Sequence, residues 1–242
     1  LNFQDFYKVT VTQQQLKLAF LSNDGVQDLV TAIVNSMYSA ANYDEFLVMK
    51  YMVARSILDG TMTGVVVDPV SKENSDNIVI KIKNTSNQMT FMCPDYNPAG
   101  VRNFSPKEDQ YLISSADFDA TMNVATLAQA FNMDKAEFDG HHVMVDSFGK
   151  LDNKRLKKLF GTDSWYAEIG DSDLAKLAQV PAVLVDKAWF MVWDNLAEYS
   201  DQYNGQGLYW NYWYHVWKTF SVSPFANCAV FVTAQQAVRS VT

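Results

Sequence analysis

The sequence predicts an α+β fold, and three observations support this prediction. Apolar residues recur at helical spacing over about 26–59, which predicts one long helix. β-Branched and aromatic residues alternate over about 207–222, which favours one long strand. Between these two segments, short apolar strand patterns alternate with short helical patterns, as in a mixed α/β layer. We therefore expect a long helix and a long strand combined with a smaller mixed region.

The composition indicates a globular chain with a substantial core. The chain has 242 residues, which suits one large domain or two closely packed domains. Hydrophobic residues make up 48% of the chain, and this content excludes global disorder. The net charge of −8 argues against a nucleic-acid-binding face, which needs a basic stripe. Such a charge would suit a surface that confines DNA without binding it tightly.

The first 25 residues predict short elements before the long helix. Val9 to Thr12 reads as an extended segment, and residues 13–21 can form a short helix. A turn follows at 22–25, where Asn23 and Asp24 are candidate N-caps. The chain has no signal-peptide pattern and begins without Met, so we expect a segment upstream of Leu1.

The long helix is expected to end near Asp59, with Gly60 as the residue that stops it. At a rise of 1.5 Å per residue, a helix of this length would span about 50 Å. That length exceeds the diameter of a small compact domain. The polar stretch at 42–45 leaves open a break into two helices.

The middle of the chain predicts short strands and helices. The expected strands are 61–67, 78–82, 111–114, 141–145 and 183–185, and a strand or turn at 189–193. The expected helices are 124–131, 134–138, 153–160 and 173–178. We expect loops or turns at 93–104, 117–123 and 198–207, where proline, glycine or polar residues gather.

The long strand is apolar on both faces. Trp210, Tyr214 and Phe220 point to one side at period two, and Trp213 and Trp217 point to the other. A strand of this kind needs cover on both sides, from its own chain or from another subunit. Pro224 interrupts the pattern, and a short strand is expected at 228–233.

Three stretches around this strand resemble one protein family. Residues 182–196, 207–217 and 221–227 closely resemble the major capsid protein of the phi-29-type short-tailed bacteriophages. A weaker resemblance extends over 16–60 and 111–148. In the family, the region that matches 78–82 is helical, so the resemblance leaves a helix open there. The residues that match the family motif, to which we assign structural roles, are Asp186, Trp189, Phe190, Asp194, Asn195, Gly207, Tyr209, Trp210, Asn211, Tyr214, His215, Trp217, Phe225 and Asn227.

The resemblance implies a Hong-Kong-97-type capsid fold with two domains. A peripheral domain would comprise 1–60 and 204–242, with the spine helix at about 26–59 and the long strand at about 207–222. An axial domain would comprise 61–203. The family also has an N-terminal arm and an extended loop upstream of the spine helix, which we expect to be missing from this chain. Residues 150–179 are longer than the matching family segment and predict an insertion.

The resemblance also implies a shell-building function without catalysis, cofactor or metal. The protein would assemble into pentamers and hexamers that form an icosahedral or prolate head around double-stranded DNA. Expected partners are further copies of the chain, a scaffolding protein and a portal. The DNA would be enclosed without sequence-specific binding, and no membrane is involved. The expected location is the virion, assembled in the cytoplasm of the bacterial host.

One alternative reading is a carbohydrate-active enzyme or a sugar-binding module. Glycoside hydrolysis needs paired carboxylates beside aromatic stacking surfaces. The residues that could provide them are Asp186, Asp194, Glu198, Trp189, Trp193 and Trp210. A membrane-interfacial protein is a third reading because tryptophan and tyrosine collect at such interfaces, but the negative charge weighs against it.

The histidines, the cysteines and one basic cluster are expected to have structural roles. His141 and His142 are strand neighbours that point to opposite faces, so they cannot hold one metal ion. His215 is expected to be a core or interface histidine, and Cys93 and Cys228 are expected to be reduced thiols. One basic cluster would form a solvated helix face or pair with an acidic neighbour; it comprises Lys150, Lys154, Arg155, Lys157 and Lys158.

Overall fold

The structure is a computed structural model that describes residues 2–21, 24–71, 73–122, 124–134, 141–161, 163 and 165–233. The chain divides into two compact units. Unit 1 comprises Leu1–Met49, Arg155–Gly161 and Met191–Ser221. Unit 2 comprises Lys50–Lys154, Thr162–Phe190 and Val222–Thr242.

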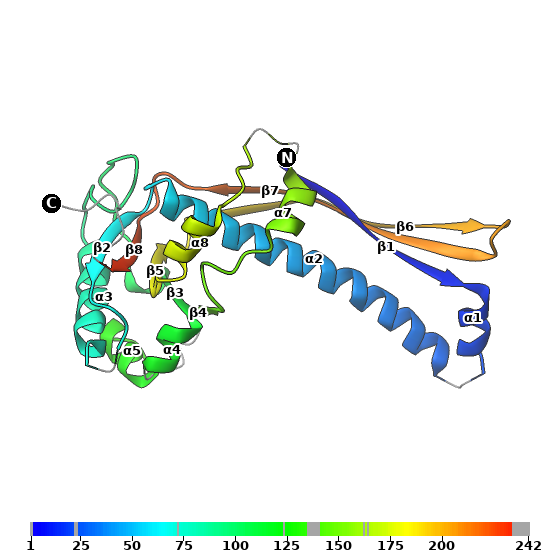
Figure 1. Ribbon diagram of the computed structural model, residues 1–242, viewed down its shortest axis with the longest axis horizontal. Coiled ribbons are helices and arrows are strands. Elements are labelled where there is room, and N and C mark those ends of the chain that lie inside the picture. The colour runs from blue at the N-terminus through cyan, green and yellow to red at the C-terminus, as the bar shows by residue number, and fades with distance from the viewer. Residues whose placement is uncertain are drawn as a thin grey trace. The chain divides into compact units, whose positions relative to one another are not determined.

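Among the described residues, helices and strands are interspersed up to α8, and four successive strands then follow (Figure 1). The helices are α1 (Gln13–Ala19), α2 (Gly25–Leu58), α3 (Ser75–Met89), η1 (Lys107–Asp109), α4 (Ala116–Thr121), α5 (Val124–Phe131), α7 (Asn153–Phe160) and α8 (Asp171–Leu177). The strands are β1 (Phe3–Thr12), β2 (Thr63–Val67), β3 (Gln110–Ser115), β4 (His142–Val145), β5 (Ala182–Asp186), β6 (Phe190–Asn204), β7 (Tyr209–Val222) and β8 (Cys228–Thr233).

The long helix predicted at about 26–59 is confirmed as α2, which runs without interruption from Gly25 to Leu58. Gly60 follows it with a φ of 66°, the left-handed conformation that glycine adopts at low cost. The possible break at 42–45 does not occur. Asp44 and Glu45 instead accept hydrogen bonds from residues of other elements of unit 1, so their polarity does not weaken the helix. Asn23, one of the two candidate N-caps, lies outside the described residues.

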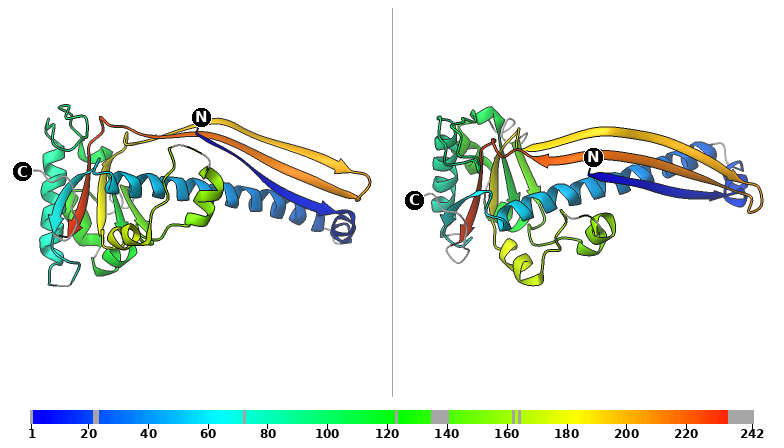
Figure 2. Two further views of the ribbon diagram at one scale, coloured as in Figure 1. Left: turned by 45° about the horizontal axis from the view of Figure 1, so that its top comes forward. Right: turned by 90° about the horizontal axis from the view of Figure 1, so that it is seen from above.

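In the described part of unit 1, the strands form one three-stranded sheet in the order β1-β7-β6 (Figure 2). β1 pairs antiparallel with β7 along its whole length, from Phe3 opposite Lys218 to Thr12 opposite Tyr209. β1 is longer than the extended segment predicted at 9–12, because its first residues also find partners on β7.

The loop predicted at 198–207 is wrong for its first part, since β6 continues to Asn204. Tyr199 stacks on Tyr214 with ring centroids 4.6 Å apart, and Tyr203 lies 5.0 Å from Trp210. These cross-strand aromatic pairs stabilise strand structure in a stretch whose polar composition favours a loop. The actual turn is short, and the Asn204 side chain accepts hydrogen bonds from two backbone N–H groups within it.

Within the described part of unit 2, the sheet has five strands in the order β2-β8-β5-β3-β4. The outer pairs β2–β8 and β3–β4 are parallel, and the inner pairs β8–β5 and β5–β3 are antiparallel. β5 is buried along its whole length, as its apolar sequence predicts for a central strand. The strands predicted at 61–67, 111–114, 141–145, 183–185 and 228–233 are confirmed as β2, β3, β4, β5 and β8.

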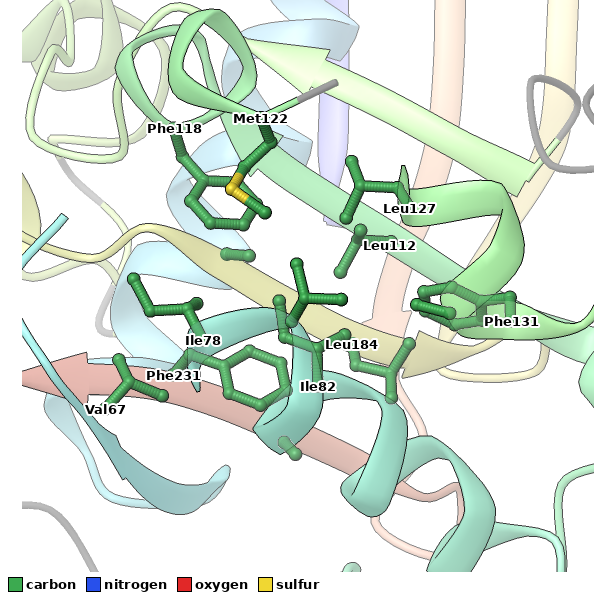
Figure 3. Packing of buried hydrophobic residues seen from close by; sticks show 14 of the residues in the cluster. Val67, Ile78, Ile82, Leu112, Phe118, Met122, Leu127, Phe131, Leu184 and Phe231 are labelled. Atoms are coloured by element: carbon green, nitrogen blue, oxygen red, sulfur yellow. The ribbon is translucent and has the colours of Figure 1, made fainter. Parts of the chain in front are cut away.

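Side chains of α3, α4 and α5 pack with strand side chains in the core of unit 2 (Figure 3). The strand predicted at 78–82 is wrong, because these residues belong to α3. Ile78 and Ile82 are almost fully buried, whereas Ile80 is 63% exposed. The four-residue spacing of the buried pair matches one face of a helix, and tertiary packing therefore overrides the local alternation.

The turn predicted at 117–123 is also corrected in part. Residues 116–121 form α4, in which the Ser115 side chain accepts a hydrogen bond from the Phe118 backbone N–H as an N-cap. Burial of Phe118 in the core holds this short helix in place. The helices predicted at 124–131 and 153–160 are confirmed, and the one predicted at 173–178 begins at Asp171. Apart from Asp134, the helical turn predicted at 134–138 lies outside the described residues.

The two units divide the chain differently from the predicted domains. β6 and most of α7 belong to unit 1, although both lie inside the predicted axial segment 61–203. The end of α2 and all of β8 belong to unit 2. Compactness alone does not assign peripheral or axial roles, so that assignment stays a prediction.

The helical register of α3 is tested by two isoleucines. Ile82→Ala removes a buried side chain and should lower the free energy of unfolding by about 2–5 kcal/mol. Ile80→Ala, which trims an exposed side chain two residues away, should change it by less than about 0.5 kcal/mol. Thermal and urea unfolding of both variants measures the difference. Equal losses would contradict the helix, because a strand would place both side chains on the same face.

Candidate functional site

The sheet of unit 1 has one face that turns away from α2 and carries exposed aromatic side chains. The register of β1 and β7 places Phe6 opposite His215, Lys8 opposite Trp213, and Gln4 opposite Trp217 on this face. Phe6 is 54% exposed and Trp217 is 40% exposed. We call this surface the aromatic face; its residues are Phe6, Tyr209, Trp213, His215 and Trp217.

The opposite face of the same sheet packs on α2. Tyr7 and Tyr214 lie opposite each other in the register, and both are almost fully buried. The ring of Tyr38 on α2 lies 5.1 Å from that of Tyr214. The alternation predicted for the long strand is therefore confirmed: one face is covered by the chain's own helix, and the aromatic face is not.

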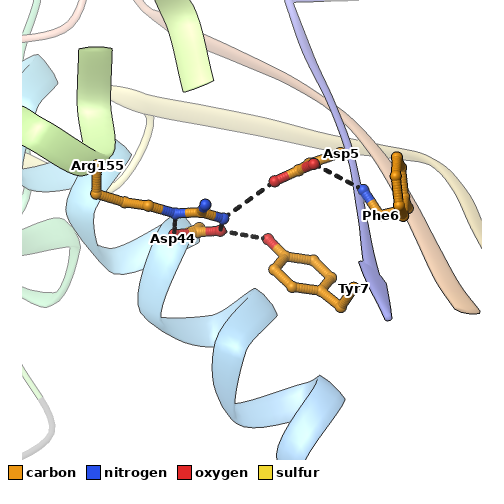
Figure 4. A network of polar contacts seen from close by, with 5 residues as sticks. All are labelled: Asp5, Phe6, Tyr7, Asp44 and Arg155. Carbon is orange, nitrogen blue, oxygen red and sulfur yellow. Dashed lines mark hydrogen bonds and ion pairs between the residues drawn. The ribbon is translucent and has the colours of Figure 1, made fainter. Parts of the chain in front are cut away.

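A buried carboxylate joins three elements of unit 1 (Figure 4). The Asp44 side chain, on α2, is 1% exposed. It accepts hydrogen bonds from the Tyr7 hydroxyl at 2.7 Å and from Arg155 Nε at 2.8 Å, and Arg155 Nη2 contacts its second oxygen. Arg155 Nη2 also donates to Asp5 at 3.0 Å. We call these residues the Asp44 network.

The contacts of the Asp44 network shift the pKa values of Arg155 and Tyr7. The hydrogen bond to Asp44 is the largest cause that raises the pKa of Arg155, which therefore stays protonated at every accessible pH. Burial, and then the hydrogen bond to Asp44, raises the pKa of Tyr7 far above its ordinary range. The network thus keeps a charged guanidinium and a neutral phenol inside unit 1.

α7 is held in unit 1 by apolar contacts as well as by Arg155. Leu156 and Phe160 are buried, and the Phe160 ring lies 6.0 Å from that of Phe3 on β1. The basic cluster predicted around this helix is therefore divided in role. Arg155 points inward to Asp44 of its own chain, whereas Lys154, Lys157 and Lys158 are exposed. In unit 2, Lys150 provides a backbone carbonyl that accepts a hydrogen bond from Lys50.

A second ionic contact ties β7 to α2 and β6. Lys218 Nζ lies 2.7 Å from Glu45 and 2.8 Å from Asp194, one of the family-motif residues. Burial lowers the pKa of Lys218, but hydrogen bonds to Asp194 and Glu45 outweigh burial and raise it overall. Next to Asp194, Asn195 donates to the Thr219 hydroxyl at 2.8 Å.

The remaining motif residues of unit 1 lie on the β6–β7 hairpin. Asn211 is buried and accepts a hydrogen bond from the Thr10 hydroxyl at 2.7 Å. His215 Nε2 contacts the Ser200 hydroxyl at 3.1 Å, and its ring lies 6.0 Å from that of Phe6. Gly207 lies in the turn that joins β6 and β7. His215 is thus a half-buried residue of the aromatic face, and the core or interface role expected for it stays a prediction.

The motif residues Asp186, Trp189 and Phe190 of unit 2 lie where β5 ends and β6 begins. Asp186 ends β5, and its carboxylate accepts a hydrogen bond from the Ala188 backbone at 2.8 Å. Trp189 is 2% exposed, and its carbonyl accepts from Ser223 at 3.0 Å. Phe190 begins β6 and is half-buried. These contacts support the turn predicted at 186–187.

Asn227 lies in a buried polar network of unit 2. It is fully buried, donates to Ser105 Oγ at 3.1 Å and accepts from Asn97 at 3.3 Å. Phe225, two residues earlier, is 58% exposed, but its carbonyl accepts from Asn103 at 2.8 Å. Hydrogen bonds from Asn97 and Asn103 therefore hold the loop predicted at 93–104 next to the residues that precede β8.

Two carboxylates of the proposed sugar site, Asp186 and Asp194, have separate structural contacts. Asp186 belongs to unit 2 and caps a turn, while Asp194 and Glu198 belong to unit 1. Asp194 forms the ion pair with Lys218 described above. None of these contacts resembles an acid and a nucleophile that face a common ligand.

One serine, one histidine and one aspartate do meet in unit 2. Ser114 Oγ lies 2.7 Å from His142 Nε2, and Asp119 Oδ1 lies 3.5 Å from the same nitrogen. A catalytic triad needs the serine and the carboxylate on different ring nitrogens. Ser114 is also fully buried, so its hydrogen bond with His142 is a structural contact inside unit 2. Its neighbour His141 contacts the ring of Tyr111.

The described residues contain no group of three or more histidine, cysteine or acidic side chains that could hold a metal ion. Cys93 and Cys228 are free thiols; Cys228 is buried as expected, whereas Cys93 is only half-buried. Burial raises the pKa of Cys228 to about 12. No helix within the described ranges is both long enough and apolar enough to cross a membrane.

Sequence reasoning missed the role of Asp44. It lies among Ala40, Leu47 and Tyr51, all on the apolar stripe of the predicted helix. A carboxylate on a buried stripe signals a buried partner. The sequence holds no signal that identifies Arg155 as that partner, 111 residues away.

The Asp44 network is tested by removing its cation. Arg155→Met leaves a buried carboxylate without its ion pair and should lower the free energy of unfolding by about 3 kcal/mol. Lys158→Met, an exposed position on the same helix, should have almost no effect. Adding Asp44→Asn to Arg155→Met should restore part of the loss, because the unpaired charge is gone. Thermal unfolding measures all three, and equal effects of the two single variants would contradict the network.

Comparisons with known proteins agree with the resemblance found in the sequence. A profile of the Phi29-like phage major capsid protein family matches residues 1–232. The major capsid protein of Bacillus phage PZA is 37% identical over 236 residues, which cover 96% of this chain and 47% of that protein. That of Bacillus phage B103 is 35% identical over 96% of this chain and 46% of that protein. The chain thus spans about half the length of these curated relatives.

Solved structures confirm the predicted fold class. A chain from the capsid structure of Staphylococcus phage Andhra matches with a TM-score of 0.68 at 15% identity, over 96% of this chain and 70% of that one. At this identity the likeness concerns the fold alone, which is the Hong-Kong-97-like capsid fold. The family profile covers almost the whole chain, and the protein therefore belongs to the Phi29-like phage major capsid proteins, a family of structural proteins.

Proposed function

We propose that the protein is the subunit of a phage head, which assembles through repeated contacts between copies into pentamers, hexamers and a closed shell around double-stranded DNA. Membership of a major capsid protein family over residues 1–232 is the observation that carries this proposal. A shell subunit needs surfaces that bury apolar area only when copies meet.

The aromatic face supports the proposal because it is such a surface. Phe6 and Trp217 are large, rigid side chains that remain exposed in the isolated chain. Aromatic residues of this kind dominate the binding energy of protein interfaces. The Asp44 network and the Lys218 ion pairs lie on the opposite side of the same sheet, where they hold it on α2. The face is therefore presented on a stiff support, which lowers the entropy lost on binding.

We further propose the roles of the two units and of the partners. Unit 1, with most of α2 and β7, would form most of the peripheral domain, and unit 2 most of the axial domain. A scaffolding protein and a portal would guide assembly in the host cytoplasm, and the shell would become part of the virion. The net charge of −8 supports a lining that encloses DNA without specific binding. We propose no enzymatic role, because two carboxylates of the sugar-site alternative, Asp186 and Asp194, have structural contacts.

The first experiment is electron microscopy of the full-length protein, expressed with and without its scaffolding partner. Rings of five or six subunits, or closed particles, are the expected result. Protein that stays monomeric at every concentration and with every partner would overturn the proposal.

The aromatic face is tested by a double variant, Phe6→Ser with Trp217→Ser. The loss of two aromatic anchors should raise the concentration needed for assembly at least about tenfold, since each anchor contributes on the order of 1–2 kcal/mol at an interface. Light scattering measures assembly, and circular dichroism checks that the variant is folded. Gln4→Ser, on the same face and opposite Trp217, is the matched control and should assemble normally. Unchanged assembly of the folded double variant would show that this face is not a contact.

A further inference from the structure

The turn that joins β6 to β7 contains the one Asn-Gly pair of the sequence, Asn204-Gly205 (Figure 1). Asparagine is most open to deamidation before glycine, because no side chain shields the glycine nitrogen that attacks the amide carbon. Gly205 has no positive φ, and a Cβ on it would meet the Tyr203 ring at 3.8 Å, an ordinary contact distance. Neither backbone conformation nor close packing therefore requires glycine at this position.

The Asn204 side chain is folded back over the turn. Its Oδ1 accepts hydrogen bonds from the backbone N–H of Gln206 at 3.0 Å and from that of Gly207 at 2.9 Å. The bond to Gln206, two residues further on, closes an Asx turn around the peptide group between the two residues. The nitrogen of that peptide group belongs to Gly205. The turn thus holds the Asn204 amide carbon over the nitrogen that would attack it.

The same contacts match the charges that develop when an amide is attacked. Negative charge collects on the carbonyl oxygen, and two backbone N–H groups that point at one oxygen form the arrangement that stabilises an oxyanion. The amide nitrogen Nδ2 donates a hydrogen bond to the Tyr209 hydroxyl at 2.9 Å. As the carbon becomes tetrahedral, this nitrogen gains a basic lone pair, and the hydroxyl is in reach to protonate it.

We propose that Asn204 is a self-modification site, at which the turn promotes deamidation of its own side chain. The Gly205 nitrogen gives its proton to water and forms a bond to the Asn204 amide carbon, and the carbonyl electron pair moves onto Oδ1. That pair then returns, the bond between the carbon and Nδ2 breaks, and the nitrogen leaves as ammonia with a proton from the Tyr209 hydroxyl. Water replaces this proton and hydrolyses the cyclic imide to aspartate or isoaspartate.

Deamidation changes both the charge and the backbone of the turn. A carboxylate replaces a neutral amide, which adds one negative charge where β6 and β7 are joined. In the isoaspartate product, the main chain passes through the former side chain of Asn204, so the group that caps the turn becomes part of its backbone. This one-way change needs no contact between copies, so it goes beyond the proposed function and does not depend on it.

The experiment compares the complete chain in its folded state and in guanidinium chloride, at the same pH and temperature. Peptide mass spectrometry follows the conversion of Asn204, and Asn195 on β6, which is followed by Leu196, reports the background rate. The folded chain should convert Asn204 at least about tenfold faster than the unfolded chain, since only the folded turn supplies the oxyanion donors. A folded-state rate equal to or below the unfolded-state rate would overturn the proposal.

Two substitutions separate the contribution of the fold from that of the Asn-Gly pair. Tyr209→Phe removes only the hydroxyl and should slow conversion in the folded chain about tenfold or more, with no change in guanidinium chloride. Gly205→Ala, whose Cβ the turn accommodates, should slow conversion in both states. Circular dichroism checks that both variants fold. A folded Tyr209→Phe chain that converts as fast as the unaltered chain would overturn the assigned chemistry, and if this variant unfolds, the comparison of the two states of the unaltered chain decides.

Discussion

The buried carboxylate of Asp44 is the constraint on which unit 1 depends. A buried carboxylate is stable only if it is paired and hydrogen-bonded, and here its donors come from Tyr7 on β1 and Arg155 on α7. Three elements that are distant in sequence must therefore meet at one point of α2. The contact makes the position of the sheet on the helix specific, which apolar packing alone does with less precision.

This constraint explains how one strand can be rich in aromatic residues on both faces. The face of β7 that includes Tyr214 is covered by α2, and Lys218 binds Glu45 on the same side. The other face carries Trp213 and Trp217, of which Trp217 is 40% exposed. Coverage of only one face is a cost for an isolated subunit, because exposed apolar surface promotes aggregation. Under the proposed assembly, the same exposure would become the source of binding energy.

Unit 2 is stabilised by apolar packing and by hydrogen bonds between neutral buried side chains. Its central strands β5 and β8 are buried, and the buried loop residues Asn97 and Ser105 both form hydrogen bonds with Asn227. Such a network favours one packing, since every alternative would leave a buried polar group without a partner.

Local patterns in the sequence determined the long helix α2, the two-faced strand β7 and the stop at Gly60, because side-chain periodicity and glycine conformation are properties of neighbouring residues. The family resemblance added the Hong-Kong-97-type fold. Tertiary structure alone decided that residues 75–89 are helical and that β6 extends to Asn204, since core packing and cross-strand tyrosine pairs outweigh local preference there. Tertiary structure also decided which residues form the candidate site. The aromatic residues of β7 could be read from the sequence, but their exposure depends on which face α2 covers. The pairing of Asp44 with Arg155 depends on contacts between distant segments, which no local pattern encodes.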